Sequence, residues 1–251
     1  MQRGFWWVKG QWYNSGMEKL KAGAKKLGLE LNSEQLERFD AYYRELVDWN
    51  QRINLTAITD YEEVQIKHFL DSLTIALAWQ PARGNNVIDV GTGAGMPGIP
   101  LKIAFPDIKL VLLEATAKKV SFLHHIKEKL GLNDVEIIVG RAEEVAHVAQ
   151  YRERFDLVLS RAVAPLPTLV ELTLPFAAIG GSFIAQKKGR VDDEISRADK
   201  AIGLLGGGVR EVKKIELAEF ADERCLIVID KIAPTPEQYP RRPGVPGKKP
   251  L

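Results

Sequence analysis

The chain has 251 residues, of which 45% are hydrophobic and 27% charged, the composition of a soluble globular protein with one large domain and a modest extension. One cysteine, four histidines and the lack of any apolar run near ~18 residues exclude an internal disulfide, a zinc cluster of ordinary spacing and a membrane span. The net charge of +2 conceals basic ends, since residues 1–26 carry six basic side chains and one acidic, and residues 231–251 carry five and one. Such ends suit contact with phosphates, or they are simply solvated.

Residues 1–16 hold three of the five tryptophans and show no clear period. This leader has three open interpretations: an upstream start, a partner-binding patch or a disordered arm. It lacks the apolar core of a signal peptide, so a cytoplasmic location is expected. Residues 17–82 are predicted to form a helical extension. Asn32 or Ser33 can cap its first long helix, and a second helix is predicted over residues 62–78.

Residues 83–232 show a different pattern, in which short apolar runs alternate with helix-length segments. The runs lie at 87–90, 110–113, 135–139, 157–159 and 183–185. This alternation predicts an α/β domain whose parallel sheet is covered on both faces. Residues 209–217 and 224–231 predict an antiparallel hairpin at one edge, after a flexible glycine turn at 206–208. Residues 233–251, with six prolines, predict an extended tail on the surface.

The sharpest motif follows the first of these strands, where residues 87–98 read VIDVGTGAGMPG. Glycines let the backbone take positive φ and let a ligand approach it closely. Gly93, Gly95 and Gly98 fit the dinucleotide fingerprint G-x-G-x-x-G. Gly91, Gly93 and Gly95 fit instead the D-x-G-x-G-x-G loop of adenosylmethionine-dependent methyltransferases. A purely structural glycine turn is the third interpretation.

Two acidic residues bear on the choice. Asp89 lies at the end of the strand, where a buried carboxylate repels a pyrophosphate and favours the ammonium group of adenosylmethionine. A dinucleotide loop begins where its strand stops, which here is Gly91 rather than Gly93. Glu114 ends the next strand and can accept both ribose hydroxyls of either cofactor. The methyltransferase interpretation is therefore favoured, and nucleoside binding is supported independently of it.

Further candidates follow the third and fourth strands. Ala142 leaves room for an adenine ring and Glu143 can face its amino group, whereas Arg141 before them has a surface salt bridge as its alternative. Arg161 follows the fourth strand, at the switch point where strand ends face the ligand crevice. The predicted cofactor-binding residues are Asp89, Gly91, Thr92, Gly93, Gly95, Met96, Glu114, Ala115, Thr116, Ala142, Glu143 and Arg161.

The residues after the fourth strand limit which kind of atom can be the methyl acceptor. Methylation of an exocyclic amine commonly uses an Asn/Asp-Pro-Pro-aromatic loop there, but residues 160–163 read SRAV. Carbon-5 of a pyrimidine needs a thiolate, and Cys225 sits inside a predicted strand with no activating context. Guanine N7 already carries a free electron pair, so alignment and electrostatics can supply most of the acceleration. An arginine such as Arg161 suits that task by binding O6 or the phosphates.

With these residues in place, the chain resembles the bacterial glucose-inhibited division protein B family, the 16S ribosomal RNA guanine-N7 methyltransferases. The resemblance runs from about Met17 to Leu251 and leaves residues 1–16 without a counterpart. The glycine loop is shared with many methyltransferases. The Asn54-Leu55-Thr56 segment, His68 with Asp71-Ser72, and the basic proline tail are more specific. Other matching stretches lie at 49–50, 118–119, 140–143, 160–162 and 188–189.

The resemblance implies a class I methyltransferase fold (Rossmann-like, mostly parallel, with the antiparallel C-terminal hairpin and a small helical N-terminal extension). It implies S-adenosylmethionine as donor and one guanine of 16S rRNA as acceptor, in the small ribosomal subunit or an assembly intermediate. Arg161, Arg141 and Arg224 are the expected catalytic residues. The expected RNA-binding residues are His68, Lys188, Arg241, Arg242, Lys248 and Lys249; for His68 a tether between helix and loop is an equal alternative.

A cytoplasmic monomer that needs no metal and no membrane is the resulting expectation. Two rivals from other classes remain open at this point. A small-molecule methyltransferase would have no evident use for the basic tail. A non-catalytic RNA-binding protein with this fold would be suggested by a degenerate glycine loop, whereas this loop is intact.

Overall fold

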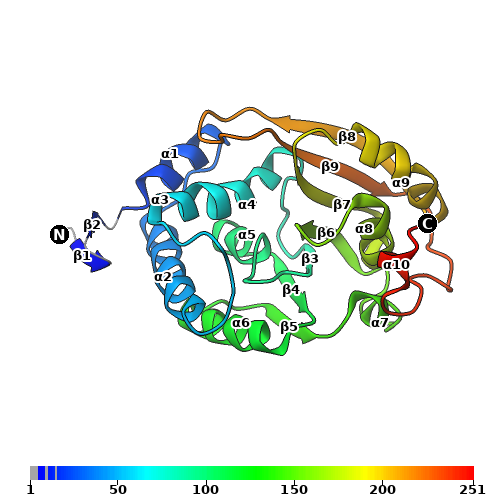
Figure 1. Ribbon diagram of the computed structural model, residues 1–251, viewed down its shortest axis with the longest axis horizontal. Helices are drawn as coiled ribbons and strands as arrows, with labels where there is room; N and C mark the ends of the chain where they lie inside the picture. The colour runs from blue at the N-terminus through cyan, green and yellow to red at the C-terminus, as the bar shows by residue number, and fades with distance from the viewer. Residues whose placement is uncertain (1–4, 9–10, 15) are drawn as a thin grey trace.

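The computed structural model describes residues 5–8, 11–14 and 16–251, and Figure 1 shows the order of its elements. β1 (Phe5–Val8) and β2 (Gln11–Asn14) pair antiparallel in a small sheet of their own. The interpretations of the leader also depend on residues 1–4, 9–10 and 15, which lie outside the described residues, so the choice among them stays open.

A helical extension precedes the main sheet. After α1 (Glu18–Lys26), α2 (Ser33–Asn50) begins at the predicted cap, because Asn32 and Gln35 each accept a hydrogen bond from the other's backbone N–H. The helix predicted over residues 62–78 is confirmed as an unbroken helical stretch over residues 61–77, but its pitch changes along its length. Its successive parts are α3 (Tyr61–Val64), the π-helical η1 (Gln65–Leu70), α4 (Asp71–Leu73) and the 3₁₀ turn η2 (Thr74–Leu77).

The main sheet has seven strands in the order β5-β4-β3-β6-β7-β9-β8. The first five strands in this order, β5, β4, β3, β6 and β7, are parallel. β9 is antiparallel to both β7 and β8, so the predicted α/β class with an antiparallel C-terminal pair is confirmed. Their bounds are β3 (Asn86–Val90), β4 (Lys109–Glu114), β5 (Val135–Val139), β6 (Phe155–Arg161), β7 (Ala177–Lys188), β8 (Gly207–Ile215) and β9 (Arg224–Lys231).

The glycine run before the hairpin differs from the flexible turn predicted at residues 206–208. Gly207 and Gly208 are not a flexible turn, because they open β8 and pair with Lys231 and Asp230 of β9. A Cβ on Gly207 would lie 2.9 Å from Cγ2 of Ile229. The glycine is therefore used for close packing.

Helices cover both faces of this sheet (Figure 1). α5 (Gly98–Ala104), α6 (Ala117–Lys129) and the helical extension pack on one face, and α8 (Leu166–Thr173), η3 (Leu174–Phe176) and α9 (Asp192–Leu204) on the other. Strand β4 contributes to both cores, since Leu110 and Leu112 point to the first and Val111 and Leu113 to the second. Between β5 and β6 there is only the short α7 (Ala142–Val145).

The C-terminal tail is bound along its length rather than simply extended. Arg152 donates hydrogen bonds to the carbonyls of Thr235, Pro236 and Tyr239, and Thr235 is buried. The tail ends in α10 (Val245–Lys248), which packs against α8. Its predicted place on the surface holds, but hydrogen bonds from the body fix it there.

Strand order sets the position of the site. β4 and β6 lie on opposite sides of β3, so the strand order reverses here, and ligands of open α/β sheets bind outside the carboxyl ends of strands at such a point. Across the described part of the chain, every helix is too short or too polar to cross a membrane.

Candidate active site

The glycine loop leaves β3 with three glycines in the left-handed region. Gly91, Gly93 and Gly95 have φ values of 72°, 61° and 91°. A Cβ on Gly91 would lie 2.6 Å from Cγ2 of Val163, in the loop after β6. Backbone conformation and space both require glycine at this position.

Asp89 holds the loop closed from beneath. This carboxyl is fully buried, and its Oδ2 accepts hydrogen bonds from Thr92 Oγ1 at 2.6 Å and from the Gly98 N–H at 2.8 Å. Burial raises its pKa to about 6; those hydrogen bonds and the charge of Arg161 oppose the rise, and Glu114 adds to it. Its Oδ1 is buried and finds no partner within the described residues. A buried acceptor without a donor fits the ammonium group of adenosylmethionine, directly or through water.

Glu114 joins the same loop to the end of β4. Its Oε2 accepts from the Gly93 N–H at 2.9 Å and its Oε1 from the Thr116 N–H at 2.8 Å. The carboxylate is 6% exposed, so these two bonds fix its direction. Carboxylate oxygens can accept more than one bond each, which leaves capacity for the hydroxyls of a ribose.

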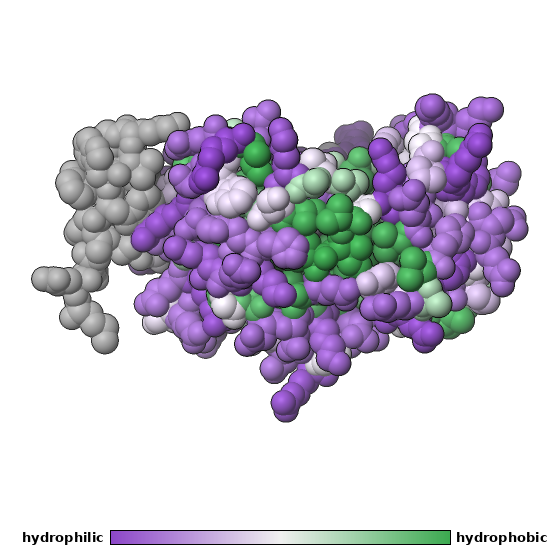
Figure 2. All heavy atoms as spheres, turned by 90° about the horizontal axis from the view of Figure 1, so that it is seen from below, coloured by the Kyte–Doolittle hydropathy of each residue, from purple (hydrophilic) through white to green (hydrophobic). Residues whose placement is uncertain are grey.

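The adenine side of the crevice lies at the end of β5. Glu143 is buried, and its Oε1 accepts a hydrogen bond from the Gly244 N–H of the tail at 3.0 Å. Figure 2 shows an apolar area on the side of the molecule where β5 and α7 lie in Figure 1. Val139 at the end of β5 is 57% exposed and Val148 after α7 is 46% exposed. An exposed apolar strand end beside Ala142 suits the face of a purine ring.

A cleft, the arginine pocket, has a volume of about 390 Å³ and is lined by residues that include His68, Asp71, Arg161, Gln186, Lys188 and Arg224. The Asp71 carboxylate lies between the two arginines, with Oδ2 2.8 Å from Arg161 Nη1 and Oδ1 2.5 Å from Arg224 Nη1. Arg224 also stacks over the ring of Phe220 at 4.5 Å. After Arg161, Ala162 takes a φ of 57°, a strained conformation for a residue with a Cβ.

His68 is tied into the wall of this pocket by a chain of hydrogen bonds. Its Nδ1 lies 3.2 Å from the Lys67 carbonyl, which can only accept, so Nδ1 carries the proton. Its Nε2 then accepts from Thr56 Oγ1 at 2.7 Å, and Thr56 Oγ1 accepts from the Ile58 N–H. Burial, followed by the charge of Arg161, lowers the pKa of His68 to about 4. This favours the tether over a cationic RNA contact.

The structure separates the predicted arginines. Arg224 joins Arg161 in the arginine pocket, but Arg141 follows β5, three strands away from β6, roughly 14 Å at ordinary strand spacing. Arg141 is exposed beside the adenine side of the crevice. Its predicted catalytic role is therefore not supported by its position.

The predicted RNA-binding residues also divide. Lys188 lies at the arginine pocket and pairs with Asp222, and Arg242, Lys248 and Lys249 are exposed on the tail. Arg241 is different, because its guanidinium forms two hydrogen bonds, at 2.9 and 2.6 Å, with the fully buried carboxylate of Glu171. It anchors the tail to α8.

Two contacts that involve the helical extension were not predicted from the sequence. Tyr42 of α2 is buried, and its hydroxyl donates to the Ala94 carbonyl in the glycine loop. Gln186 of β7 donates through Nε2 to the Asp71 carbonyl at 2.6 Å. The only sequence signal was the apolar face of α2, on which a tyrosine reads as core.

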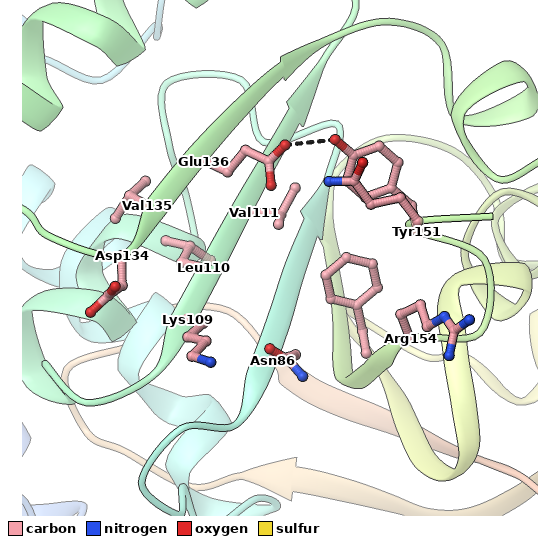
Figure 3. Close-up of a pocket in the computed structure, with 11 residues that line it drawn as sticks. Asn86, Lys109, Leu110, Val111, Asp134, Val135, Glu136, Tyr151 and Arg154 are labelled. Carbon is pink, nitrogen blue, oxygen red and sulfur yellow. Dashed lines mark hydrogen bonds between the residues drawn. The ribbon is translucent and has the colours of Figure 1, made fainter. Parts of the chain in front are cut away.

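A second cleft, of about 500 Å³, lies at the opposite end of the strands (Figure 3). Asn86, Lys109 and Val135 begin their strands here, and Tyr151 donates a hydrogen bond to Glu136 at 2.6 Å. Ligands of open α/β sheets bind outside the carboxyl ends, and none of the predicted site residues lines this cleft.

Comparison with known proteins agrees with this geometry. A family model described as rRNA small subunit methyltransferase G matches residues 35–224. The ribosomal RNA small subunit methyltransferase G of Dehalococcoides mccartyi is 55% identical over 236 residues, which are 94% of this chain and 100% of the relative. That of Brevibacillus brevis is 47% identical over 224 residues, 89% of this chain and 94% of the relative.

Solved structures are similar in fold. A mutant of MtNAS in complex with S-adenosylmethionine superposes with a TM-score of 0.53 at 14% identity, covering 86% of this chain and 98% of that one. The YcgJ protein of Bacillus subtilis gives 0.52 at 13% identity, covering 66% of this chain and 100% of that one. At such identities the likeness concerns the fold alone.

Proposed function

The chain belongs to the family of ribosomal RNA small subunit methyltransferase G, and we propose that adenosylmethionine binds on the glycine loop and a guanine binds in the arginine pocket. The enzyme transfers a methyl group from S-adenosylmethionine to N7 of a guanine in 16S rRNA. The observation that carries this placement is the position of Arg161. It is the last residue of β6, which pairs with β3, and its Nη1 donates a hydrogen bond to Asp71 in the pocket, while its positive charge lies near enough to Asp89 to oppose the rise in that carboxyl's pKa.

The residues present fit the cofactor. The unpartnered Oδ1 of Asp89 would accept from its ammonium group, Glu114 would accept from its ribose hydroxyls, and Glu143 would face the adenine amino group. The loop backbone from Gly91 to Met96 would lie against the rest of the adenosylmethionine molecule. The other proposed contacts are Thr92, Ala115, Thr116 and Ala142. When bound, this cofactor supplies an electrophilic methyl group on a sulfonium.

The guanine needs orientation rather than a base. Its N7 already carries the lone pair that would accept the methyl group as the sulfur–carbon bond of the donor broke and its electrons passed to sulfur, so no residue would need to remove a proton. Arg161 and Arg224 would donate hydrogen bonds to O6 or to the flanking phosphates and so fix N7 in line with the methyl group. His68 stays neutral at physiological pH and supports the wall of the pocket.

The basic side chains around this edge would bind the RNA backbone. Lys188, Arg242, Lys248 and Lys249 are exposed and carry the RNA-binding role in this proposal, with affinity that falls as salt rises. Arg241 contributes by holding the tail in place. Arg141 lies beside the cofactor and we assign it to RNA positioning there.

The chain is then divided as the sequence suggests. We assign residues 17–82 to the helical extension, 83–232 to the methyltransferase domain and 233–251 to the basic tail, with 1–16 as the leader. The helical extension contributes to both parts of the site, since Tyr42 donates a hydrogen bond to the glycine loop and Asp71 pairs with Arg161 in the arginine pocket. A cytoplasmic enzyme that acts as a monomer completes the proposal.

The test is transfer of radiolabelled methyl groups from adenosylmethionine to ribosomal RNA and to 30S particles from cells that lack this protein. The product is mapped by cleavage at 7-methylguanosine. Label at one N7 position of 16S rRNA is the expected result. Label at another kind of atom would remove the N7 assignment. No label despite tight cofactor binding would favour a small-molecule substrate, and no cofactor binding would favour a non-catalytic RNA-binding protein.

A further inference from the structure

The arginine pocket is also lined by one acidic residue, Asp71. Asp71 is 6% exposed and comes from α4 of the helical extension, whereas Arg161 and Arg224 come from β6 and β9 of the main sheet. Its two oxygens are divided between them, at 2.8 and 2.5 Å. One carboxylate thus links three elements at the mouth of one cleft.

This arrangement answers an electrostatic problem. Two guanidinium groups that share one partly buried pocket repel each other, and their side chains are only 16% and 4% exposed. A carboxylate between them offsets one of the two positive charges, and Asp222 Oδ1 lies 2.9 Å from Arg224 Nε on its other side. Asp71 also sets direction at Arg161, which donates through Nη1 to Asp71 Oδ2, because a guanidinium carries five N–H donors in a fixed plane. Arg224 Nη1 forms an ion pair with Asp71 Oδ1 without hydrogen-bond geometry. The donors left on Arg161 are then aimed by the bond to Asp71.

Asp71 is itself held in place. Its backbone carbonyl accepts from Gln186 Nε2 at 2.6 Å and from Thr74 Oγ1 at 2.6 Å, and Gln186 also donates to Thr74 Oγ1 at 3.2 Å. The π-helical η1 ends immediately before it, and such turns change which side chains face a site. A surface ion pair would need none of this support.

We propose that Asp71 is a positioning residue, which acts through Arg161 and Arg224 to hold them in the geometry that orients the guanine. This inference rests on the proposed function of the pocket. It assigns to the helical extension a part in the methyl transfer itself, beyond RNA contact.

The experiment compares Asp71→Asn and Asp71→Glu with the wild-type chain, measuring kcat and KM for 30S particles, cofactor affinity and melting temperature. Asp71→Asn removes the charge at nearly constant shape. Asp71→Glu keeps the charge, and so the balance in the pocket, but displaces it by one methylene. We expect both variants to lose kcat by about a hundredfold, with KM changed less than about threefold, because alignment of N7 is lost rather than RNA affinity.

The matched control is Asp40→Asn. Asp40 lies in the same extension, is also 6% exposed and pairs with Arg44, but lies outside the arginine pocket. It is expected to lower the melting temperature and leave kcat unchanged. If Asp71→Asn fails to fold, Asp71→Glu alone decides, since a residue needed only for charge balance would keep wild-type kcat in that variant.

A double substitution tests the route of the effect. If Asp71 acts through Arg161 and Arg224, Asp71→Asn costs clearly less activity once Arg161 is alanine than it does in the wild-type chain, because only the part that acts through Arg224 remains. Full additivity of the two losses, or wild-type kcat in Asp71→Glu, would overturn the proposal. Failure of the wild-type chain to methylate guanine N7 would instead overturn the proposed function, so the two failures are distinguishable.

Discussion

The glycine loop and the arginine pocket lie at the same edge of the sheet but are built in opposite ways. The bonds that close the loop join residues 3, 9 and 21 positions apart, and two of the three donors are backbone N–H groups. In the pocket, Asp71 is 90 residues from Arg161 and Gln186 is 115 residues from Asp71, and charged side chains hold the arrangement. In the proposed function, local backbone geometry therefore shapes the cofactor side of the site, and long-range ion pairing shapes the substrate side.

The most disruptive test of this division is Gly91→Asp. A side chain at positive φ is strained, its Cβ would overlap Val163, and its charge would enter the loop. We expect adenosylmethionine affinity to fall by roughly a thousandfold or more, about 4 kcal/mol, as measured by calorimetry. Gly84→Ala is the control, since Gly84 also has positive φ (82°) but has no atom within 4 Å of a Cβ there. Unchanged cofactor binding in Gly91→Asp would contradict the placement.

Arg161→Ala tests the arginine pocket. Asp71 keeps Arg224 as a partner, so the fold is expected to survive. Methylation should fall by about a hundredfold, the usual cost of removing one charged donor from an active site, with cofactor affinity within about threefold. Arg210→Ala removes a comparable ion pair, with Asp230, outside the arginine pocket and should leave turnover intact. Near-normal turnover in Arg161→Ala would exclude it from the reaction.

The pH dependence of cofactor binding sharpens the comparison on the loop side. The folded-state pKa of Asp89, about 6, lies above its ordinary value of 3.8, mainly because of burial. The free protein therefore takes up a proton as pH falls through 6, which stabilises its fold but removes the charge that the cofactor ammonium needs. Affinity should fall about tenfold between pH 7 and pH 5.

The control for this measurement is Asp89→Asn, which should bind weakly and independently of pH over the same range. A pH profile shared by wild type and Asp89→Asn would assign the titration to another group. Melting curves at both pH values exclude unfolding as the cause.

The smallest expected effect crosses the boundary between the two regions. Tyr42→Phe removes the hydroxyl that donates to the Ala94 carbonyl and so loosens the loop from the helical extension. Such a bond contributes about 1 kcal/mol, and cofactor affinity should fall about fivefold. Tyr43→Phe removes a bond of similar kind, to the Thr59 carbonyl, from the same helix. It should reduce stability and leave cofactor affinity unchanged; equal effects of both would mean that Tyr42 acts on stability alone.

The same contrast explains what could be predicted from sequence. The loop, Asp89 and Glu114 were accessible because their order along the chain is their order in space. Arg161 was accessible because strand ends of an α/β sheet meet at one edge. The partners of Asp71 depend on strand order, which apolar runs do not specify. Arg241 looked free for RNA because charge patterns do not show that Glu171 is buried opposite it.

Strand order also has a consequence for how the enzyme assembles. β8 precedes β9 in the chain, yet β9 lies between β7 and β8, so β8 has no place in the sheet until β9 has arrived. Arg224 is the first residue of β9. We therefore expect the arginine pocket to form late in folding, because it depends on long-range strand pairing, while the glycine loop can form with β3 and β4. During refolding, cofactor binding and methylation would then return at different times.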